Sequence, residues 1–309
     1  MGQHDHSRPP RLLVTGAAGR LGRLAVGHLR EAGLYQVVAT DKAPTPDGIT
    51  ADLTQPATQW AGLLDGVDAV LHCAGHRGPG TNWQDAQELN LDMSLRLMMA
   101  ARRRVKRFIF LSSNWVMAGH RFTEGPITAD RDPDPINPYG MSKLAIERVG
   151  VALAEAGDFD FVALRIGMVI ADPLEAAGRL PSLRRWSQEM WLSGADFCQG
   201  IAKALSAPVT GACVLNLVSD NPGTRWDLSE TRQRIGYAPT TGWQVALPPS
   251  HGTAEATAGR LNRCRTEIIR HLTAGSADRP DEAVATCRQL LSPTDDELHD
   301  PHQDEPRPK

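Results

Sequence analysis

The sequence predicts an α/β fold, in which helices cover both faces of a doubly wound parallel sheet. From residue 11 onward, short runs rich in Val, Ile, Leu and Phe alternate with longer amphipathic segments. Strands of a parallel sheet are buried on both faces, so they show continuous apolar runs, and their crossover connections are usually helices. A chain of 309 residues is long enough for one large domain or two small ones.

Each short apolar run bounded by turn residues is expected to form a strand. The expected strands are RLLVTG (11–16), YQVVATD (35–41), a minor strand in ITADLT (49–54), DAVLHCAG (68–75), RFIFLSS (107–113), DFVALRIGMVI (160–170) and a late edge strand in CVLNLVSD (213–220). Helices are expected between them, near residues 20–32, 55–65, 84–104 and 139–156.

The expected domain spans residues 11–248, with a small C-terminal substrate lobe interleaved at about 171–212 and 221–248. Residues 1–10 are polar and proline-rich, which favours a disordered tail. Residues 249–309 are expected to form a linker, two possible short helices (258–273 and 281–292) and a disordered acidic tail.

Composition excludes several classes of function. The net charge of −3 gives no indication of a nucleic-acid partner or an anionic membrane surface. No apolar run approaches the roughly 20 residues that a membrane span needs, and the N-terminus lacks a signal-peptide core. The five cysteines are scattered without a C-x-x-C pair, which favours packing residues over a disulfide frame or a zinc site. We therefore expect a cytoplasmic protein without a metal.

A glycine-rich turn follows the first expected strand directly. In TGAAGRLG, Gly16, Gly19 and Gly22 have the spacing G-x-x-G-x-x-G and open a helix. Such glycines let the backbone turn tightly and approach a pyrophosphate, which then lies against the free N–H groups of the helix N-terminus. This position between a strand and a helix indicates a Rossmann-type dinucleotide site.

Asp41 ends the second expected strand, nineteen residues after Gly22. A carboxylate there can accept hydrogen bonds from ribose hydroxyls and would repel a 2′-phosphate, so NAD is favoured over NADP. Lys42 and Arg20 weaken this preference, because either cation could contact such a phosphate. The other residues expected to border the cofactor are Ala18, Arg20 and Leu21 in the turn, Asp52 and Leu53 after the third strand, and Ala74 and Gly75 after the fourth.

The segment NPYGMSK places Tyr139 four residues before Lys143, on one face of an expected helix. A free tyrosine has a pKa of about 10 and is a poor base at neutral pH. A nearby ammonium group and the positive nicotinamide of bound NAD would favour the phenolate. Ser113 and Asn114 follow the fifth strand at the carboxyl edge of the sheet, where ligands of such folds bind. Ser113 could hold the substrate oxygen while Tyr139 removes its proton.

These motifs together resemble the extended short-chain dehydrogenase/reductase superfamily, over residues 11 to about 245. The resemblance implies that Ser113, Tyr139 and Lys143 are the catalytic triad, and that Lys143 also holds the nicotinamide ribose. SSNWVM, RIGMVIADP, MWLSGADF and NPGTRWDLSETRQRIGYAP resemble the uronate dehydrogenase branch. That branch uses NAD to oxidise the anomeric hydroxyl of a hexuronic acid to a lactone.

The same resemblance implies substrate contacts. Asn114 would contact the sugar, and Arg184 or Arg185 would bind the uronate carboxylate, since a guanidinium can bind a carboxylate bidentately. The sequence departs from the branch at HRGPGTNW (76–83) and at Met168, both at the expected substrate pocket. Arg77 on that loop could supply a different polar contact.

Three functions therefore stay open. The first is an NAD-dependent dehydrogenase acting on a small sugar acid, with Ser113, Asn114, Arg77, Met168, Arg184 and Arg185 around the substrate. The second is an NAD-retaining epimerase or a carbonyl reductase acting on another small metabolite. The third is a non-catalytic dinucleotide sensor, which would have no need of the triad. By analogy with the superfamily, helices 84–104 and 139–156 are expected to form a homodimer face.

Overall fold

The computed structural model describes residues 8–76, 78–123 and 125–246. The expectations for residues 1–7, for Arg77 and for the segment after residue 246 lie outside these described residues.

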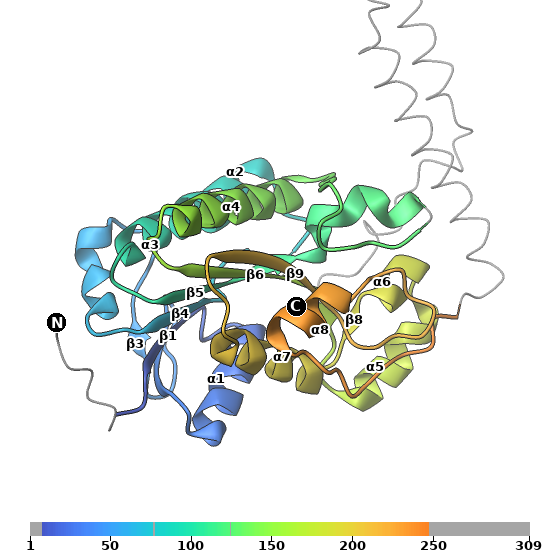
Figure 1. Cartoon of the computed structure of the whole chain (residues 1–309), viewed down its shortest axis with the longest axis horizontal. Helices are drawn as coiled ribbons and strands as arrows, with labels where there is room; N and C mark the ends of the chain where they lie inside the picture. The colour runs from blue at the N-terminus through green and yellow to red at the C-terminus, as the bar shows by residue number, and fades with distance from the viewer. Residues whose placement is uncertain (1–7, 77, 124, 247–309) are drawn as a thin grey trace, which may run out of the picture. The chain divides into compact units, whose positions relative to one another are not determined.

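The central sheet has seven strands in the order β3-β2-β1-β4-β5-β6-β9, and every neighbouring pair is parallel (Figure 1). This confirms the predicted doubly wound sheet. The strands are β1 (Arg11–Thr15), β2 (Gln36–Asp41), β3 (Ile49–Thr50), β4 (Ala69–His72), β5 (Arg107–Ser113), β6 (Asp160–Ile166) and β9 (Ala212–Leu217). The strand order reverses between β1 and β4, so their carboxyl ends diverge around a crevice where such folds bind ligands.

Helices cover both faces of the sheet (Figure 1). Helices α1 (Arg20–Ala32) and α7 (Gly194–Ser206) lie on one face, and α3 (Met93–Ala101) and α4 (Pro138–Glu155) lie on the other. Successive strand side chains point to opposite faces. Accordingly, Leu12 and Val14 belong to the core that contains α1 and α7, whereas Leu13 belongs to the core under α3 and α4. The predicted helices at 20–32 and 139–156 are confirmed almost to the residue.

Three predicted elements differ from the structure. The expected strand 160–170 breaks at Gly167, where a Cβ atom would lie 1.9 Å from Met190 O, and the chain continues as β7 (Met168–Val169), paired with β8 (Trp191–Leu192). The expected helix 55–65 is two 3₁₀ turns, η1 (Ala57–Gln59) and η2 (Ala61–Leu64). The expected helix 84–104 begins as α2 (Trp83–Asp85) and continues as a π-helical segment, η3 (Ala86–Asp92), before α3.

The segment expected to form the substrate lobe contains α5 (Pro173–Arg179), η5 (Leu180–Ser182), α6 (Arg185–Glu189) and, later, α8 (Ser229–Ile235). Ile170, Ala176, Leu180 and Trp191 form a small core of their own there. Helix α7 falls inside the expected range but packs with α1, where Cys198 Sγ contacts Leu24 O at 3.8 Å. The limits of the lobe stay a prediction.

The cations of the basic run ARRRVKR (101–107) form ion pairs and hydrogen bonds with other parts of the chain. Arg102 and Arg103 pair with the buried Asp158, Arg104 pairs with Asp65, and Lys106 pairs with Asp68. The guanidinium of Arg107 donates to the carbonyls of Ala204, Leu205, Ala207 and Val209. It therefore caps the C-terminus of α7, where unpaired carbonyls favour a cation.

No helix among the described residues is long and apolar enough to cross a membrane. Met99 on α3 and Met141 on α4 are exposed. Exposed apolar side chains on both helices are compatible with the expected dimer face, which stays a prediction.

Candidate active site

The glycine turn between β1 and α1 fits a dinucleotide because its backbone leaves no room for side chains. Gly16 has a φ of +69°, and a Cβ atom on it would lie 2.5 Å from Ala74 N. A Cβ atom on Gly22 would lie 2.0 Å from Gly16 O. Gly19 caps α1 without a side-chain hydrogen bond, so the first N–H groups of this helix can receive a pyrophosphate.

Asp41 lies at the end of β2, where its carboxylate accepts from Ala18 N at 3.0 Å and from Ala43 N at 2.9 Å. These two bonds fix its orientation beside the glycine turn, and a carboxylate retains further acceptor positions for ribose hydroxyls. Arg20 reaches the other way, donating from Nη1 to Val169 O at 2.6 Å. Of the two cations that could favour a 2′-phosphate, Arg20 is thus committed to strand β7, and Lys42 is exposed.

The remaining predicted cofactor residues lie after β3 and β4. The carboxylate of Asp52 accepts from the hydroxyl and the N–H of Thr54, and these hydrogen bonds lower its pKa. Leu53 is buried. After β4, Ala74 N donates to Thr15 Oγ1 at 3.4 Å. Gly75 has a φ of +155°, and a Cβ atom there would lie 3.4 Å from Lys143 Nζ. The cofactor side of the site therefore meets the predicted catalytic lysine at Gly75.

Ser113, Tyr139 and Lys143 come together from two elements. Ser113 ends β5, and Tyr139 and Lys143 lie on the first turns of α4, which begins after Asn137. The side chain of Asn137 accepts from Gly140 N at 2.8 Å and so caps the helix. All three predicted catalytic side chains are buried, and Ser113 forms a side-chain hydrogen bond with Tyr139.

Gly140 explains how α4 approaches the strand so closely. A Cβ atom on it would lie 2.4 Å from Trp115 O, in η4 (Asn114–Phe122), the segment that follows Ser113. Trp115 N in turn donates to Ser113 Oγ at 3.2 Å. The glycine next to Tyr139 is therefore part of the contact that brings Tyr139 to Ser113.

Lys143 points its ammonium group between the sheet and the tyrosine. Its Nζ donates to Leu111 O at 3.0 Å and lies 4.8 Å from the ring centroid of Phe110 and 5.8 Å from that of Tyr139. Burial lowers the pKa of Lys143 to about 8, and the neighbouring Cys73 and Glu147 partly oppose this.

The pKa of Tyr139 does not follow the expectation from the sequence. Burial raises it, and the hydrogen bond from Ser113 only partly lowers it. Lys143 is not among the causes that lower it. The polypeptide alone therefore favours the neutral phenol, and the lowering of this pKa by bound NAD stays a prediction.

Asn90 is a polar residue at this site that the sequence did not reveal. It lies in the π-helical segment η3 and is 1% exposed. Its Oδ1 accepts from His76 N at 2.7 Å, and its Nδ2 donates to Ser142 Oγ at 3.0 Å. Ser142 Oγ donates to Tyr139 O at 2.8 Å. Asn90 thus ties the loop after β4 to the start of α4. The only local signal was an asparagine on an expected helix, which is ordinarily solvated.

The predicted substrate residues divide into two groups. Asn114 is 1% exposed, and neither its Oδ1 nor its Nδ2 has a hydrogen-bond partner among the described residues. Met168 is half-buried on β7, and its N–H donates to Met190 O. Arg184 precedes α6, is half-buried, and its side chain forms no hydrogen bond or ion pair within the described chain. Arg185, by contrast, pairs with Glu189 at 2.9 Å.

Glu189 is completely buried and also binds Arg225 bidentately, at 2.8 and 2.6 Å. The buried carboxylate of Glu189 thus also forms an ion pair with Arg185, four residues earlier on the same helix. Of the two predicted carboxylate ligands, Arg184 is therefore the one whose guanidinium remains available.

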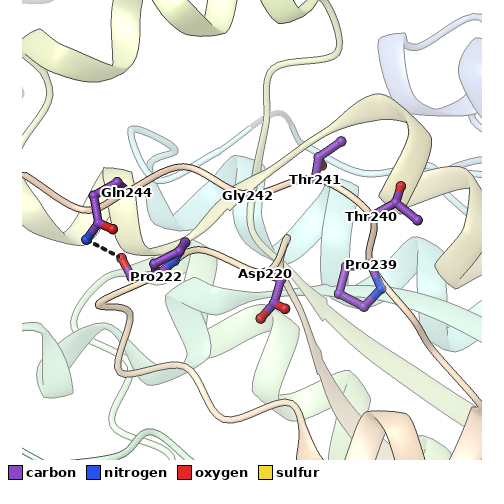
Figure 2. Close-up of a pocket in the computed structure, with 7 residues that line it drawn as sticks. All are labelled: Asp220, Pro222, Pro239, Thr240, Thr241, Gly242 and Gln244. Atoms are coloured by element: carbon purple, nitrogen blue, oxygen red, sulfur yellow. Dashed lines mark hydrogen bonds between the residues drawn. The ribbon is translucent and has the colours of Figure 1, made fainter.

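A separate open pocket of about 460 Å³ lies elsewhere (Figure 2). Its lining comprises Asp220, Pro222, Pro239, Thr240, Thr241, Gly242 and Gln244. None of the predicted site residues lines it, so it is not the candidate active site. No group of three or more His, Cys, Asp or Glu side chains suited to a metal occurs within the described part of the chain.

The chain is similar to several known proteins. The model of the NAD dependent epimerase/dehydratase family matches residues 12–185. Uronate dehydrogenase of Pseudomonas putida is 31% identical over 238 residues, which cover 74% of this chain and 83% of that protein. L-arabinose 1-dehydrogenase (NAD(P)(+)) of Haloferax volcanii is 28% identical over 253 residues, covering 74% and 96%.

The crystal structure of uronate dehydrogenase from Agrobacterium tumefaciens is 25% identical, with a TM-score of 0.63 over 75% of this chain and 85% of that one. Because the family model covers more than half of the chain, and a relative above 30% identity covers most of it, the chain belongs to the NAD-dependent epimerase/dehydratase family and is an NAD-dependent oxidoreductase.

Proposed function

We propose that this protein oxidises the anomeric hydroxyl of a small sugar acid to a lactone, with hydride transfer to NAD. The observation that carries the proposal is the convergence of Ser113, Tyr139 and Lys143 at the carboxyl edge of the sheet, beside the glycine turn. This arrangement supplies a hydrogen-bond donor, an acid/base and a cation next to the cofactor residues.

The side chains divide the proton chemistry among them. Ser113 holds the reacting oxygen by a hydrogen bond, and Tyr139 accepts its proton. Lys143, fixed by Leu111 O, places its charge beside the phenol, and it would also hold the nicotinamide ribose of a bound cofactor. Bound NAD⁺ would accept the hydride, that is, the hydrogen and two electrons that leave the carbon bearing this hydroxyl. Burial of all three side chains excludes water from this transfer.

Unpaired polar atoms support a hydroxyl-rich substrate. Leaving a buried donor or acceptor without a partner costs about 1–3 kcal/mol. Asn114 has two such atoms, and Thr81, on the loop after β4, has a buried hydroxyl without a partner among the described residues. His76 N is bound to Asn90, and Pro79 O accepts from Asn137 Nδ2, so the loop that carries Thr81 is joined to the start of α4. Sugar hydroxyls could satisfy both residues.

We assign the binding of the substrate carboxylate to Arg184. Its guanidinium is half-buried and without a partner in the described chain, whereas Arg185 is held by Glu189. A second candidate substrate is a neutral aldose, because Arg185, one of the two alternative candidates for binding a carboxylate, is already paired with Glu189. The similarity to an L-arabinose 1-dehydrogenase supports this second candidate.

The first experiment follows NADH absorbance with purified protein, NAD and a panel of uronic acids, neutral aldoses and polyols. We expect reduction of NAD with a uronate and loss of activity in Tyr139→Phe, because phenylalanine cannot accept the proton. A Tyr139→Phe protein that retains wild-type turnover would contradict the assigned acid/base. Silence across the panel, with NAD still bound, would contradict the proposed substrate class.

The second experiment separates a sugar acid from a neutral sugar. Losing a hydrogen bond to a charged group costs about 1.5–3 kcal/mol, so Arg184→Met should lower kcat/KM for the uronate by roughly 10- to 100-fold. Turnover of a neutral aldose should not change. Arg179→Met is the matched control, because Arg179 is exposed and pairs with Glu175 on α5. Equal loss on both sugars would show that Arg184 does not bind the acid group.

A further inference from the structure

A buried ion pair lies directly behind the candidate catalytic residues. Arg165 on β6 binds the carboxylate of Glu147 on α4, with Nη2 to Oε2 at 2.9 Å and Nε to Oε1 at 3.1 Å. The two side chains are only 4% and 2% exposed. Burying two charges costs much of what their attraction returns, so such a pair is weak evidence for a role in stability alone. The contacts of this ion pair with neighbouring elements indicate a further role.

Both partners are joined to elements that carry the site. Ser112 donates its hydroxyl to Glu147 Oε1, and Ser112 is the register partner of Arg165 between β5 and β6. The next residue of β5 is Ser113. Arg165 Nη1 donates to Ala129 O at 3.0 Å and lies 3.2 Å from Met117 Sδ. One guanidinium thus joins α4, the segment before it and the segment after Ser113.

Glu147 also lies one helical turn after Lys143, on the same face of α4. Its negative charge raises the pKa of Lys143, against the larger lowering by burial. The other titratable groups that face Lys143 are Cys73 and His72 at the end of β4 and Tyr139 on α4. His72 is neutral because burial lowers its pKa to about 3, and Cys73 stays a thiol because burial raises its pKa to about 12. Of the groups that raise the pKa of Lys143, Glu147 is the one that lies on the same helix.

We propose that Glu147, held by Arg165 and Ser112, is a positioning residue that fixes α4 against β5, so that Tyr139 and Lys143 meet Ser113. Its carboxylate also lies one helical turn from Lys143, where it favours the charged ammonium group. The inference rests on the proposed function, in which these three residues perform the proton transfer. Glu147 does not itself touch the reacting atoms.

The test compares Glu147→Gln with Glu155→Gln, a matched change at an exposed position at the end of the same helix. We expect Glu147→Gln to lower kcat by roughly 10- to 100-fold, because small misplacements of catalytic groups reduce turnover by such factors. KM for NAD should change little. The alkaline limb of its kcat profile should move to lower pH, because Lys143 loses its proton earlier. Glu155→Gln should match wild type in every respect.

A second variant keeps the test independent of folding. Glu147→Gln leaves Arg165 buried without its counter-charge, which destabilises the fold. Glu147→Leu/Arg165→Met removes both charges, and replacing a buried pair by apolar residues is often neutral. We expect this double variant to have a higher thermal midpoint than Glu147→Gln and still to show the low kcat. Wild-type kcat in the double variant would overturn the positioning role.

A third measurement needs no substrate. The chain has five lysines, so ¹³C NMR of the lysine Cε groups can follow the titration of Lys143, assigned with Lys143→Met. We expect a lower Lys143 midpoint in both Glu147 variants than in wild type and Glu155→Gln. An unchanged midpoint would overturn the electrostatic half of the proposal. If wild type oxidised no sugar of the panel, the proposed function would fail, while this titration would still decide whether Glu147 raises the pKa of Lys143.

Discussion

Replacing Gly140 by alanine should separate the two halves of the candidate catalytic site. The added Cβ atom would lie 2.4 Å from Trp115 O and 3.0 Å from Pro135 Cβ. Trp115 O is a backbone atom and cannot rotate away, so either α4 or η4 must shift. Because Trp115 N binds Ser113 Oγ, and Tyr139 precedes Gly140, a shift of either element increases the separation between Ser113 and Tyr139.

The magnitude follows from two effects. Overpacking of this kind costs about 1–3 kcal/mol of stability. For a chain of this size that corresponds to a thermal midpoint lowered by roughly 2–4 °C per kcal/mol. A displacement of about 1 Å between reacting groups can reduce kcat roughly 100-fold. KM for NAD should change little, since the glycine turn lies on a different element.

The assay pairs thermal unfolding with NADH production on a substrate that wild type oxidises. Gly27→Ala is the matched control, because Gly27 lies inside α1 with open space around its Cβ position. It should raise stability by about 0.5–1 kcal/mol and leave kcat unchanged. A Gly140→Ala protein with the kcat and thermal midpoint of wild type would refute the close contact as the device that positions Tyr139.

Three further predictions follow from single side chains. Lys143→Met should abolish activity. At neutral pH its free energy of unfolding should exceed that of wild type by up to about 3 kcal/mol, because wild type bears the cost of lowering the pKa of Lys143 from 10.5 to about 8. Between about pH 8 and 10.5 unfolded wild type binds more protons than folded wild type, so its stability rises with pH in that window. The difference in stability between Lys143→Met and wild type should therefore shrink, and urea unfolding at several pH values checks the sign. Arg107→Met should lose about 2–3 kcal/mol in urea unfolding with unchanged kcat, because it uncaps α7; unchanged stability would contradict this capping role. Asp41→Asn should raise KM for NAD roughly tenfold and lower KM for NADP, measured by steady-state kinetics, and an unaltered NAD/NADP ratio would exclude Asp41 as the discriminating residue.

Local features of the sequence determined much of the site. The glycine turn requires backbone conformations and close approaches that only glycine allows, as Gly16 and Gly22 show. The spacing from Tyr139 to Lys143 is a property of any α-helix. Ser113 ends an apolar run, and the carboxyl ends of parallel strands meet at one edge. The spacing of the glycines, of Tyr139 and Lys143, and the end of the apolar run are each visible within a few residues, so these signals can be recognised without tertiary structure.

Other properties were decided only when distant segments packed together. Glu189 occupies Arg185 with the help of Arg225, and Arg165 binds Glu147 from a neighbouring strand. Asn90 reaches Ser142 from a π-helical segment that its local pattern did not predict. The direction of the Tyr139 pKa belongs to the same class, since it reflects burial by several elements. Local sequence fixes which groups share a helix face, but the partner and burial of a charged group depend on what long-range packing brings against it.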